Sequence, residues 1–210
     1  LLESIGMPTH SMALELGRNA IIPMLQFLEQ SGVGGPDFIR MLNHLNKKIG
    51  FDLYGKDLGV DCQDEFSGRL TVNLGVLRYE SGQFVVRLDL RYPVTCNFRE
   101  VSEKIIASFH QDGFDCTENT YWDPIYFPKD HFLIRILLKS YREIMKDQRE
   151  PIVSGSGSYA KVMPNIAAFG AIFPGESMAW HQVNEYIDID QQLKMAEIYA
   201  AAIYELAVSL

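Results

Sequence analysis

The chain has 210 residues, enough for one large domain or two small ones, and its 47% hydrophobic and 22% charged residues are typical of a globular protein. Its formal net charge of -8 comes without any basic stripe, so we expect no nucleic-acid partner and no binding to anionic membranes. No apolar run approaches the ~18 residues that a membrane-spanning helix needs.

The start of the chain shows no basic segment followed by an apolar block, which is the pattern of a signal peptide. We therefore expect a cytoplasmic protein. The three cysteines, Cys62, Cys96 and Cys116, are scattered and form no CxxC pair, so we expect reduced thiols. Because ordered-looking sequence begins almost at once after Leu1, which is not a methionine, we also expect a piece of a longer polypeptide.

The first 123 residues alternate strand-like and helix-like segments. Apolar residues at every second position from Arg69 to Tyr79 predict a strand, and Ser81-Gly82 predicts a turn into a second strand. Asn97 and Glu100 have the spacing of a capping box at a helix start. We expect strands at 1–5, 69–79, 84–92 and 114–122, helices at 19–30, 38–49 and 97–113, and a loop at 51–68.

This order is strand, helix with an extra helix, strand, strand, helix, strand. It is the ferredoxin-like βαββαβ order, which forms a four-stranded antiparallel sheet with helices on one face. The sequence therefore predicts an α+β fold with a ferredoxin-like domain over residues 1–123.

Residues 124–210 have a different pattern. Asp130 can cap a helix that runs to about Lys146, and a last helix is expected at about 190–208. Between them, apolar segments at 150–153 and 165–173 predict strands, separated by a loop of small residues. Strands that alternate with helices indicate one end of an α/β domain.

Two loops in this second part hold more polar chemistry than packing needs. His181 lies in Trp180-His181-Gln182-Val183-Asn184-Glu185, where its imidazole could bind zinc and Glu185 could orient the ring, or His181 is an ordinary hydrogen-bonded histidine. One histidine cannot hold zinc, which takes three or four protein ligands. The loop from Gly155 to Lys161 could cradle a carboxylate with its N–H groups, or it is a plain flexible loop; it lacks the spacing of a phosphate-binding loop.

Two further candidates lie in the first part: His10 in a loop and Arg91 at the end of a strand. Taken alone, each is as well explained as a surface residue. Taken in order with the two loops above, they resemble the M20 metallopeptidases, in the dipeptidase branch that includes Xaa-His and carnosinase-like enzymes. The resemblance covers essentially the whole chain and rests on these segments: Gly6-Met7-Pro8-Thr9-His10-Ser11, Gly17-Arg18-Asn19-Ala20, Leu90-Arg91-Tyr92-Pro93, Gly157-Ser158-Tyr159-Ala160-Lys161, Phe173-Pro174-Gly175 and His181-Gln182-Val183-Asn184-Glu185-Tyr186-Ile187.

The resemblance implies a lid over residues 1–123 and the C-terminal segment of an α/β zinc-peptidase catalytic domain over 124–210. In such enzymes two zinc ions activate a water that attacks a dipeptide. His181 would be a metal ligand with Glu185 behind it, and His10 would stabilise the oxyanion. Arg91 would bind the substrate's free C-terminal carboxylate, for which a forked guanidinium is well suited.

The loop at Gly157 and Ser158 would bind the same carboxylate through its backbone, with Lys161 nearby. Here the chain departs from the family pattern, which commonly reads Gly-Gly-Thr and ends in Arg. Lysine keeps the charge but loses the two-pronged geometry, so the substrate preference can differ.

The family's other metal ligands lie in an N-terminal half with an H-x-D motif and a Glu-Glu pair, and this sequence contains neither. The resemblance therefore implies a fragment that needs the missing half to work and is inactive alone. Two alternatives stay open: another M20 activity, such as an aminoacylase or deacylase, and a non-catalytic interaction module. In either case, the lid could pair in a homodimer.

Overall fold

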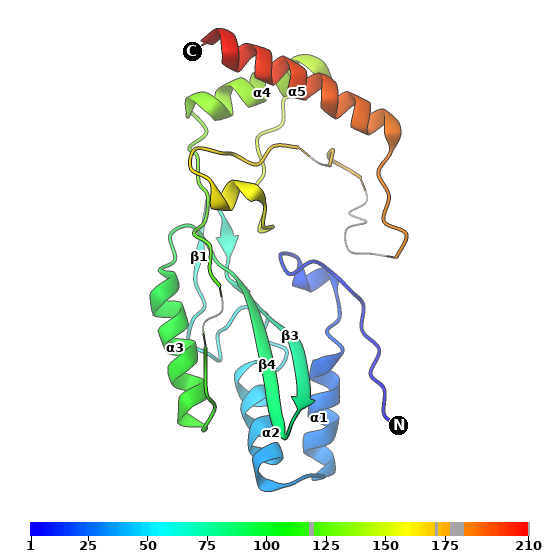
Figure 1. Cartoon of the computed structure of the whole chain (residues 1–210), viewed down its shortest axis with the longest axis vertical. Coiled ribbons are helices and arrows are strands. Elements are labelled where there is room, and N and C mark those ends of the chain that lie inside the picture. Colours follow the sequence, from blue (N-terminus) through cyan, green and yellow to red (C-terminus); the bar gives the residue numbers. More distant parts are fainter. Residues whose placement is uncertain (118–119, 171, 177–182, 210) are drawn as a thin grey trace. The chain divides into compact units, whose positions relative to one another are not determined.

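A computed structural model describes residues 1–117, 120–170, 172–176 and 183–209. The chain divides into two compact units, one of Leu1–Tyr121 with Ser154–Ser156 and one of Trp122–Val153 with Gly157–Leu210. Across the described residues there are five α-helices and two antiparallel hairpins, so the expected mixed α+β class is confirmed (Figure 1).

A long hairpin is the centre of the first unit. Strands β3 (Thr71–Glu80) and β4 (Gln83–Arg91) pair antiparallel, with one irregularity in the register between Leu74 and Val76. Ser81 and Gly82 both have positive φ angles, as a two-residue turn with the right twist for a hairpin requires. The hairpin predicted from the alternating pattern is confirmed.

Three helices pack with this hairpin around one apolar core: α1 (Ile21–Ser31), α2 (Pro36–Lys48) and α3 (Phe98–Gln111). Figure 1 shows α1 and α2 side by side next to β3 and β4. The predicted cap of α3 is present, since Asn97 Oδ1 accepts from the Arg99 N–H at 3.1 Å. The N-cap of α1 is Ala20, and Asn19, one residue earlier, accepts from the Ile21 N–H at 2.7 Å. The most completely buried leucines of the core are Leu25, Leu42, Leu45, Leu70 and Leu74.

The two outer strands of the expected four-stranded sheet are not formed by the described residues. Within the described residues, 1–5 belong to no strand, and the only isolated bridge joins Met7 to Arg18. In 114–117 the side chains do alternate, with Phe114 and Cys116 packed against the core, but the backbone joins no ladder. The prediction of a ferredoxin-like sheet was therefore wrong here, because alternating burial can arise from an extended segment that packs by its side chains alone.

The segment expected to be a plain loop, 51–68, contains a short strand. β1 (Gln63–Asp64) pairs with β2 (Gly68–Arg69), and next to it Cys62 forms a disulfide with Cys96, with the two Cα atoms 6.6 Å apart. The prediction of three reduced thiols was wrong for this pair. Cys116 remains a free thiol and is half-buried. Scattered sequence positions gave no sign that the fold brings Cys62 and Cys96 together.

In the second unit, α4 (Phe132–Met145) packs against α5 (Ile189–Ser209). Their contact buries Ile136, Leu137 and Ser140 of α4 and Met195, Ile198 and Ala202 of α5. The N-terminal cap of α4 is His131, whose Nδ1 accepts from the Leu133 N–H at 3.3 Å, and not the predicted Asp130.

The strands expected at 150–153 and 165–173 are absent from the described residues. The chain near 170 packs instead on α5, where the Tyr199 hydroxyl donates to the Phe169 carbonyl at 2.7 Å. A Cβ atom at Gly170 would lie 2.4 Å from the Tyr199 hydroxyl oxygen, so only glycine fits this approach. Strands need hydrogen-bonding neighbours, and the described part of this unit offers none. None of the described helices is both long and apolar enough to cross a membrane.

Candidate functional site

Arg91, the last residue of β4, contacts two other segments that the sequence analysis singled out, the His10 loop and the small-residue loop that begins near Gly155. Its Nε donates to Ser11 Oγ at 3.1 Å, its Nη1 donates to the Gly155 carbonyl at 3.3 Å, and its Nη2 donates to Asp89 Oδ2 at 2.9 Å. Its side chain is 26% exposed. The guanidinium is thus fixed by three acceptors and still reaches solvent.

The loop that carries His10 is closed on itself and tied to the hairpin. The Ala13 N–H donates to the His10 carbonyl at 2.9 Å, and the Met12 N–H donates to His10 Nδ1 at 3.2 Å. Thr71 Oγ1, on β3, donates to the Ser11 carbonyl at 3.2 Å. His10 directly precedes Ser11, which contacts Arg91, and these bonds hold the loop that both residues share.

The turn at Ser154–Ser156 completes this neighbourhood. A Cβ atom at Gly155 would lie 2.9 Å from Met12 Cβ, so the turn packs closely on the His10 loop. The hydroxyls of Ser154 and Ser156 bond each other at 2.6 Å. The structure therefore brings together Arg91, the His10 loop and the start of the small-residue loop, which lie far apart in the sequence.

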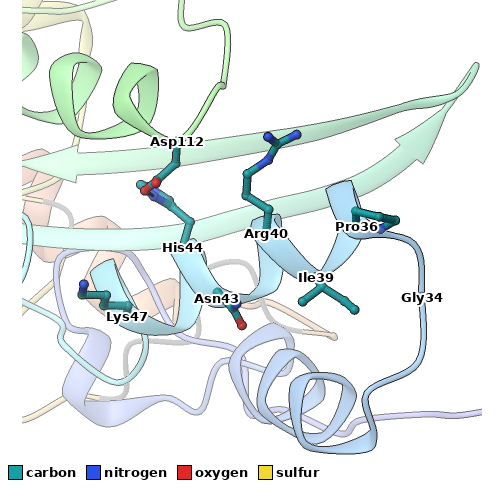
Figure 2. A pocket seen from close by; sticks show the side chains of 8 residues that line it. All are labelled: Gly34, Pro36, Ile39, Arg40, Asn43, His44, Lys47 and Asp112. Atoms are coloured by element: carbon teal, nitrogen blue, oxygen red, sulfur yellow. Dashed lines mark hydrogen bonds and ion pairs between the residues drawn. The ribbon is translucent and has the colours of Figure 1, made fainter.

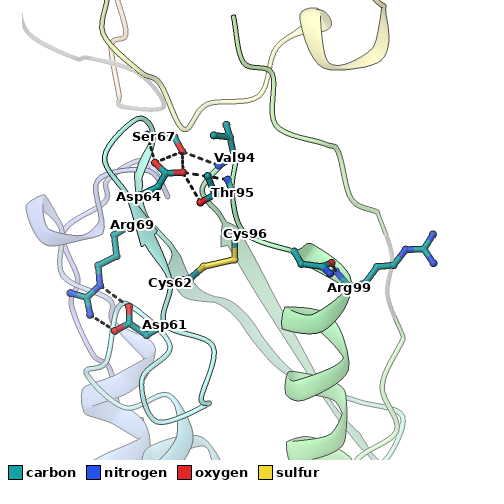
Figure 3. The surroundings of a disulfide bond; sticks show 10 residues. Asp61, Cys62, Asp64, Ser67, Arg69, Val94, Thr95, Cys96 and Arg99 are labelled. Carbon is teal, nitrogen blue, oxygen red and sulfur yellow. Dashed lines mark hydrogen bonds and ion pairs between the residues drawn. A yellow bond between two sulfur atoms is a disulfide. The ribbon is translucent and has the colours of Figure 1, made fainter. Parts of the chain in front are cut away.

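The segment that follows Arg91 is held by the loop of β1 and β2 (Figure 3). The Val94 N–H donates to Ser67 Oγ at 2.8 Å, and Thr95 Oγ1 donates to Asp64 at 3.0 Å. The Cys62–Cys96 disulfide joins the same two segments covalently. The chain directly after Arg91 is therefore anchored by hydrogen bonds and by a covalent bond.

Asp64 is the centre of this anchor, because one carboxylate accepts from the N–H and hydroxyl groups of both Ser67 and Thr95. Partial burial acts to raise the pKa of the Asp64 carboxyl, but these hydrogen bonds outweigh it and lower that pKa to about 2. Nearby, Asp61 accepts two bonds from Arg69, whose guanidinium also lies over the ring of Tyr54 at 4.0 Å. The Arg69 hydrogen bonds lower the pKa of Asp61.

The predicted substrate-binding residues Gly157, Ser158 and Lys161 belong to the second unit. Ser158 Oγ accepts from the Ala160 N–H at 3.3 Å, and the Ser158 carbonyl accepts from the Lys161 N–H at 3.0 Å, which forms a short 3-10 turn over Tyr159–Val162. The backbone after Ser158 is therefore a single 3-10 turn.

His181, the predicted metal ligand, lies outside the described residues. Glu185 is described and exposed. Among residues 1–117, 120–170, 172–176 and 183–209, no group of three or more His, Cys, Asp or Glu side chains could hold a metal ion. The described residues thus do not by themselves fit a zinc centre, which needs at least three protein ligands.

A second place of interest is a hollow of about 660 Å³ beside α2, lined by the residues labelled in Figure 2. His44 is almost fully buried and bonds Asp112 through Nδ1, which lowers the pKa of the Asp112 carboxyl. The rings of Phe109 and Phe114 pack on the same imidazole. His44 thus joins α2 to the end of α3, a pair that no motif in the sequence indicated.

The sequence analysis missed all three contacts of Arg91, those with Ser11, Asp89 and Gly155. Asp89 stands two residues before Arg91, and residues at that spacing share one face of a strand, so this pair was open to prediction. The contact with the Gly155 carbonyl was not, because backbone acceptors carry no side-chain signal.

A comparison with protein-family models found no match for the chain. Over 210 residues, 99% of this chain and 44% of the relative, it is 35% identical to "Putative dipeptidase YtjP" of Bacillus subtilis. Over 209 residues it is 30% identical to a "Putative dipeptidase" of Staphylococcus epidermidis, and over 204 residues it is 28% identical to one of Staphylococcus aureus. The chain is related to these proteins. It spans less than half of their length.

Proposed function

We propose that this chain is part of a metal-dependent dipeptidase of the M20 type, which cleaves dipeptides with a free C-terminal carboxylate. The observation that carries the proposal is the convergence on Arg91 of the His10 loop and the Ser154–Ser156 turn. A half-buried guanidinium with neutral partners on two sides is suited to a carboxylate ligand. The similarity to proteins named as dipeptidases supports the same activity.

In this proposal Arg91 binds the C-terminal carboxylate of the substrate, and the backbone of Gly157 and Ser158 binds it as well, with Lys161 adding positive charge. His10 stabilises the negative charge that develops on the scissile carbonyl oxygen. Residues 1–123 form the lid, and 124–210 form the end of an α/β catalytic domain.

Two zinc ions would supply a polarised water as nucleophile. Of this chain, only His181 is proposed as a ligand, with Glu185 orienting its ring. The remaining ligands would come from the part of the relatives' length that this chain does not span. We therefore infer that the 210 residues alone hydrolyse nothing. As a separate part of the proposal, carried over from the sequence analysis, the complete protein acts in the cytoplasm.

The first test is a substrate panel on the full-length protein supplied with zinc. Hydrolysis of dipeptides but not of N-acetyl amino acids supports the dipeptidase, whereas the reverse preference indicates an aminoacylase. His181→Ala should lose both bound metal and activity. Full metal occupancy in that variant would refute the ligand assignment.

One observation favours a second candidate, an interaction module that pairs through its sheet. Within the described residues β3 and β4 form a sheet of two strands only, so the outer edge of each strand has no β partner. Such edges pair readily with a second copy. Two results together would exclude both candidates: the full-length protein shows no peptidase activity, and charged or proline substitutions at these edges leave its dimer unaffected.

A further inference from the structure

Asp89 lies on the same face of β4 as Arg91, because alternate residues of a strand point the same way. Leu88, before Asp89, and Leu90, between Asp89 and Arg91, pack against the apolar core. Asp89 and Arg91 therefore face away from the core. Their cross-strand neighbours on β3 are the polar residues Asn73 and Thr71.

Asp89 is the only charged acceptor that Arg91 has among the described residues. Its bond to Nη2 measures 2.9 Å, against 3.1 Å to the Ser11 hydroxyl and 3.3 Å to the Gly155 carbonyl. Hydrogen bonds between two charged groups are roughly twice as strong as those between neutral ones. Asp89 therefore contributes most to the orientation of the guanidinium.

A guanidinium has five N–H groups. Ser11, Gly155 and Asp89 accept from three of them, which leaves one N–H on Nη1 and one on Nη2 in the described part of the chain. Two N–H groups are what a bidentate contact with a carboxylate requires.

We propose that Asp89 is a positioning residue that holds the Arg91 guanidinium so that its two remaining N–H groups receive the C-terminal carboxylate of the substrate. This inference rests on the proposed function, in which Arg91 binds that carboxylate. Asp89 acts through Arg91 and touches no reacting atom.

Positioning and simple electrostatics give opposite expectations. A carboxylate beside Arg91 repels the carboxylate of the substrate, so removing the charge of Asp89 would by itself strengthen binding. If Asp89 instead holds the guanidinium in place, removing its side chain weakens binding. The sign of the change in KM therefore separates the two roles.

The experiment uses the full-length, metal-loaded protein with one dipeptide in two forms, the free acid and the C-terminal amide. For Asp89→Ala we expect KM for the free acid to rise about tenfold, with kcat changed less than about twofold, as expected for lost ground-state binding. The weaker reaction with the amide should not change. Asp89→Asn keeps an acceptor oxygen without the charge, and should restore KM to within about threefold of the original protein.

Glu80 offers a matched control. It pairs with Arg78 at 3.5 Å, also two residues apart on one strand, but near the turn of the hairpin and well exposed. Glu80→Ala should leave both reactions unchanged. Should Asp89→Ala fail to fold, Asp89→Leu, which has nearly the same shape and no acceptor, takes its place with the same expectation.

A KM that falls or stays constant in Asp89→Ala overturns the inference, and so does an equal rise for acid and amide. If the original protein prefers the acid to the amide and Asp89→Ala has the same KM values as the original protein, only the role of Asp89 is refuted. If the original protein hydrolyses neither form, or both equally well, the proposed function fails as well.

Discussion

The Cys62–Cys96 disulfide makes a quantitative prediction about the first unit. It closes a loop with a sequence separation of 34 residues. The chain-entropy relation gives a loss of about 13 cal/mol/K in the unfolded chain for a loop of this size, or about 3.8 kcal/mol at 25 °C. Replacing both cysteines by serine should therefore lower the free energy of unfolding of this unit by about 3–4 kcal/mol.

Hydrogen exchange at the amides of β3 and β4 measures this effect locally. The core amides of the hairpin should exchange several hundredfold faster, on the order of 500-fold, in the Cys62→Ser/Cys96→Ser variant than in the oxidised protein. The reducing agent dithiothreitol should accelerate exchange in the original protein to a similar degree and leave the double variant unaffected. Cys116→Ser removes a thiol without removing a cross-link, so it serves as the control.

Two results would refute this reasoning. Trapping of free thiols that labels Cys62 and Cys96 in air-oxidised protein would show that the bond does not form. Equal exchange rates in the oxidised and reduced forms, with the bond verified by mass, would show that the cross-link leaves the unfolded chain's entropy unchanged.

Three further predictions concern stability. The pKa of Asp64 is lowered to about 2 in the folded protein, against about 4 in the unfolded chain. The ionised carboxylate therefore contributes its full stabilisation above about pH 4, and this stabilisation is lost as the pH falls from about 4 to 2. In acid unfolding, the Asp64→Asn variant should lack this pH dependence. Leu74→Ala, at a fully buried position, should cost about 2–5 kcal/mol in denaturant unfolding, whereas Leu16→Ala, at an exposed one, should cost less than about 0.5 kcal/mol. The Lys139–Glu205 pair between α4 and α5 is partly exposed, so a double-mutant cycle should give a coupling energy under about 1 kcal/mol.

Local signals in the sequence were sufficient for the hairpin and for most helices of the first unit. The alternation from Arg69 to Tyr79 and the cap at Asn97 each act over a few residues, and both features are present in the structure. Strand pairing is different, because it depends on neighbours far away in the chain. The alternation at 114–117 is real, yet in the described part of the chain no strand lies beside it to form a ladder.

Of the candidate site, the charged side chain of Arg91 was predicted from the sequence, but the groups that contact it were not. Arg91 was identified because the strand end Leu90-Arg91-Tyr92-Pro93 resembles a segment of the M20 family, and the structure adds its contacts with Ser11, Asp89 and Gly155. A serine hydroxyl and a backbone carbonyl are too common in sequences to indicate a contact. The disulfide partner of Cys62 was hidden for a similar reason, since the fold alone decides which thiols meet.

The central claim is that Arg91 binds a free C-terminal carboxylate. It is tested most directly by kcat/KM of the full-length protein and of its Arg91→Ala variant on a dipeptide and on its C-terminal amide. Loss of a bidentate charged contact worth about 3 kcal/mol predicts a fall of roughly 100-fold for the free acid. The amide reaction should change less than about threefold, and Arg78→Ala should alter neither. Equal losses on the acid and the amide in Arg91→Ala would contradict the account.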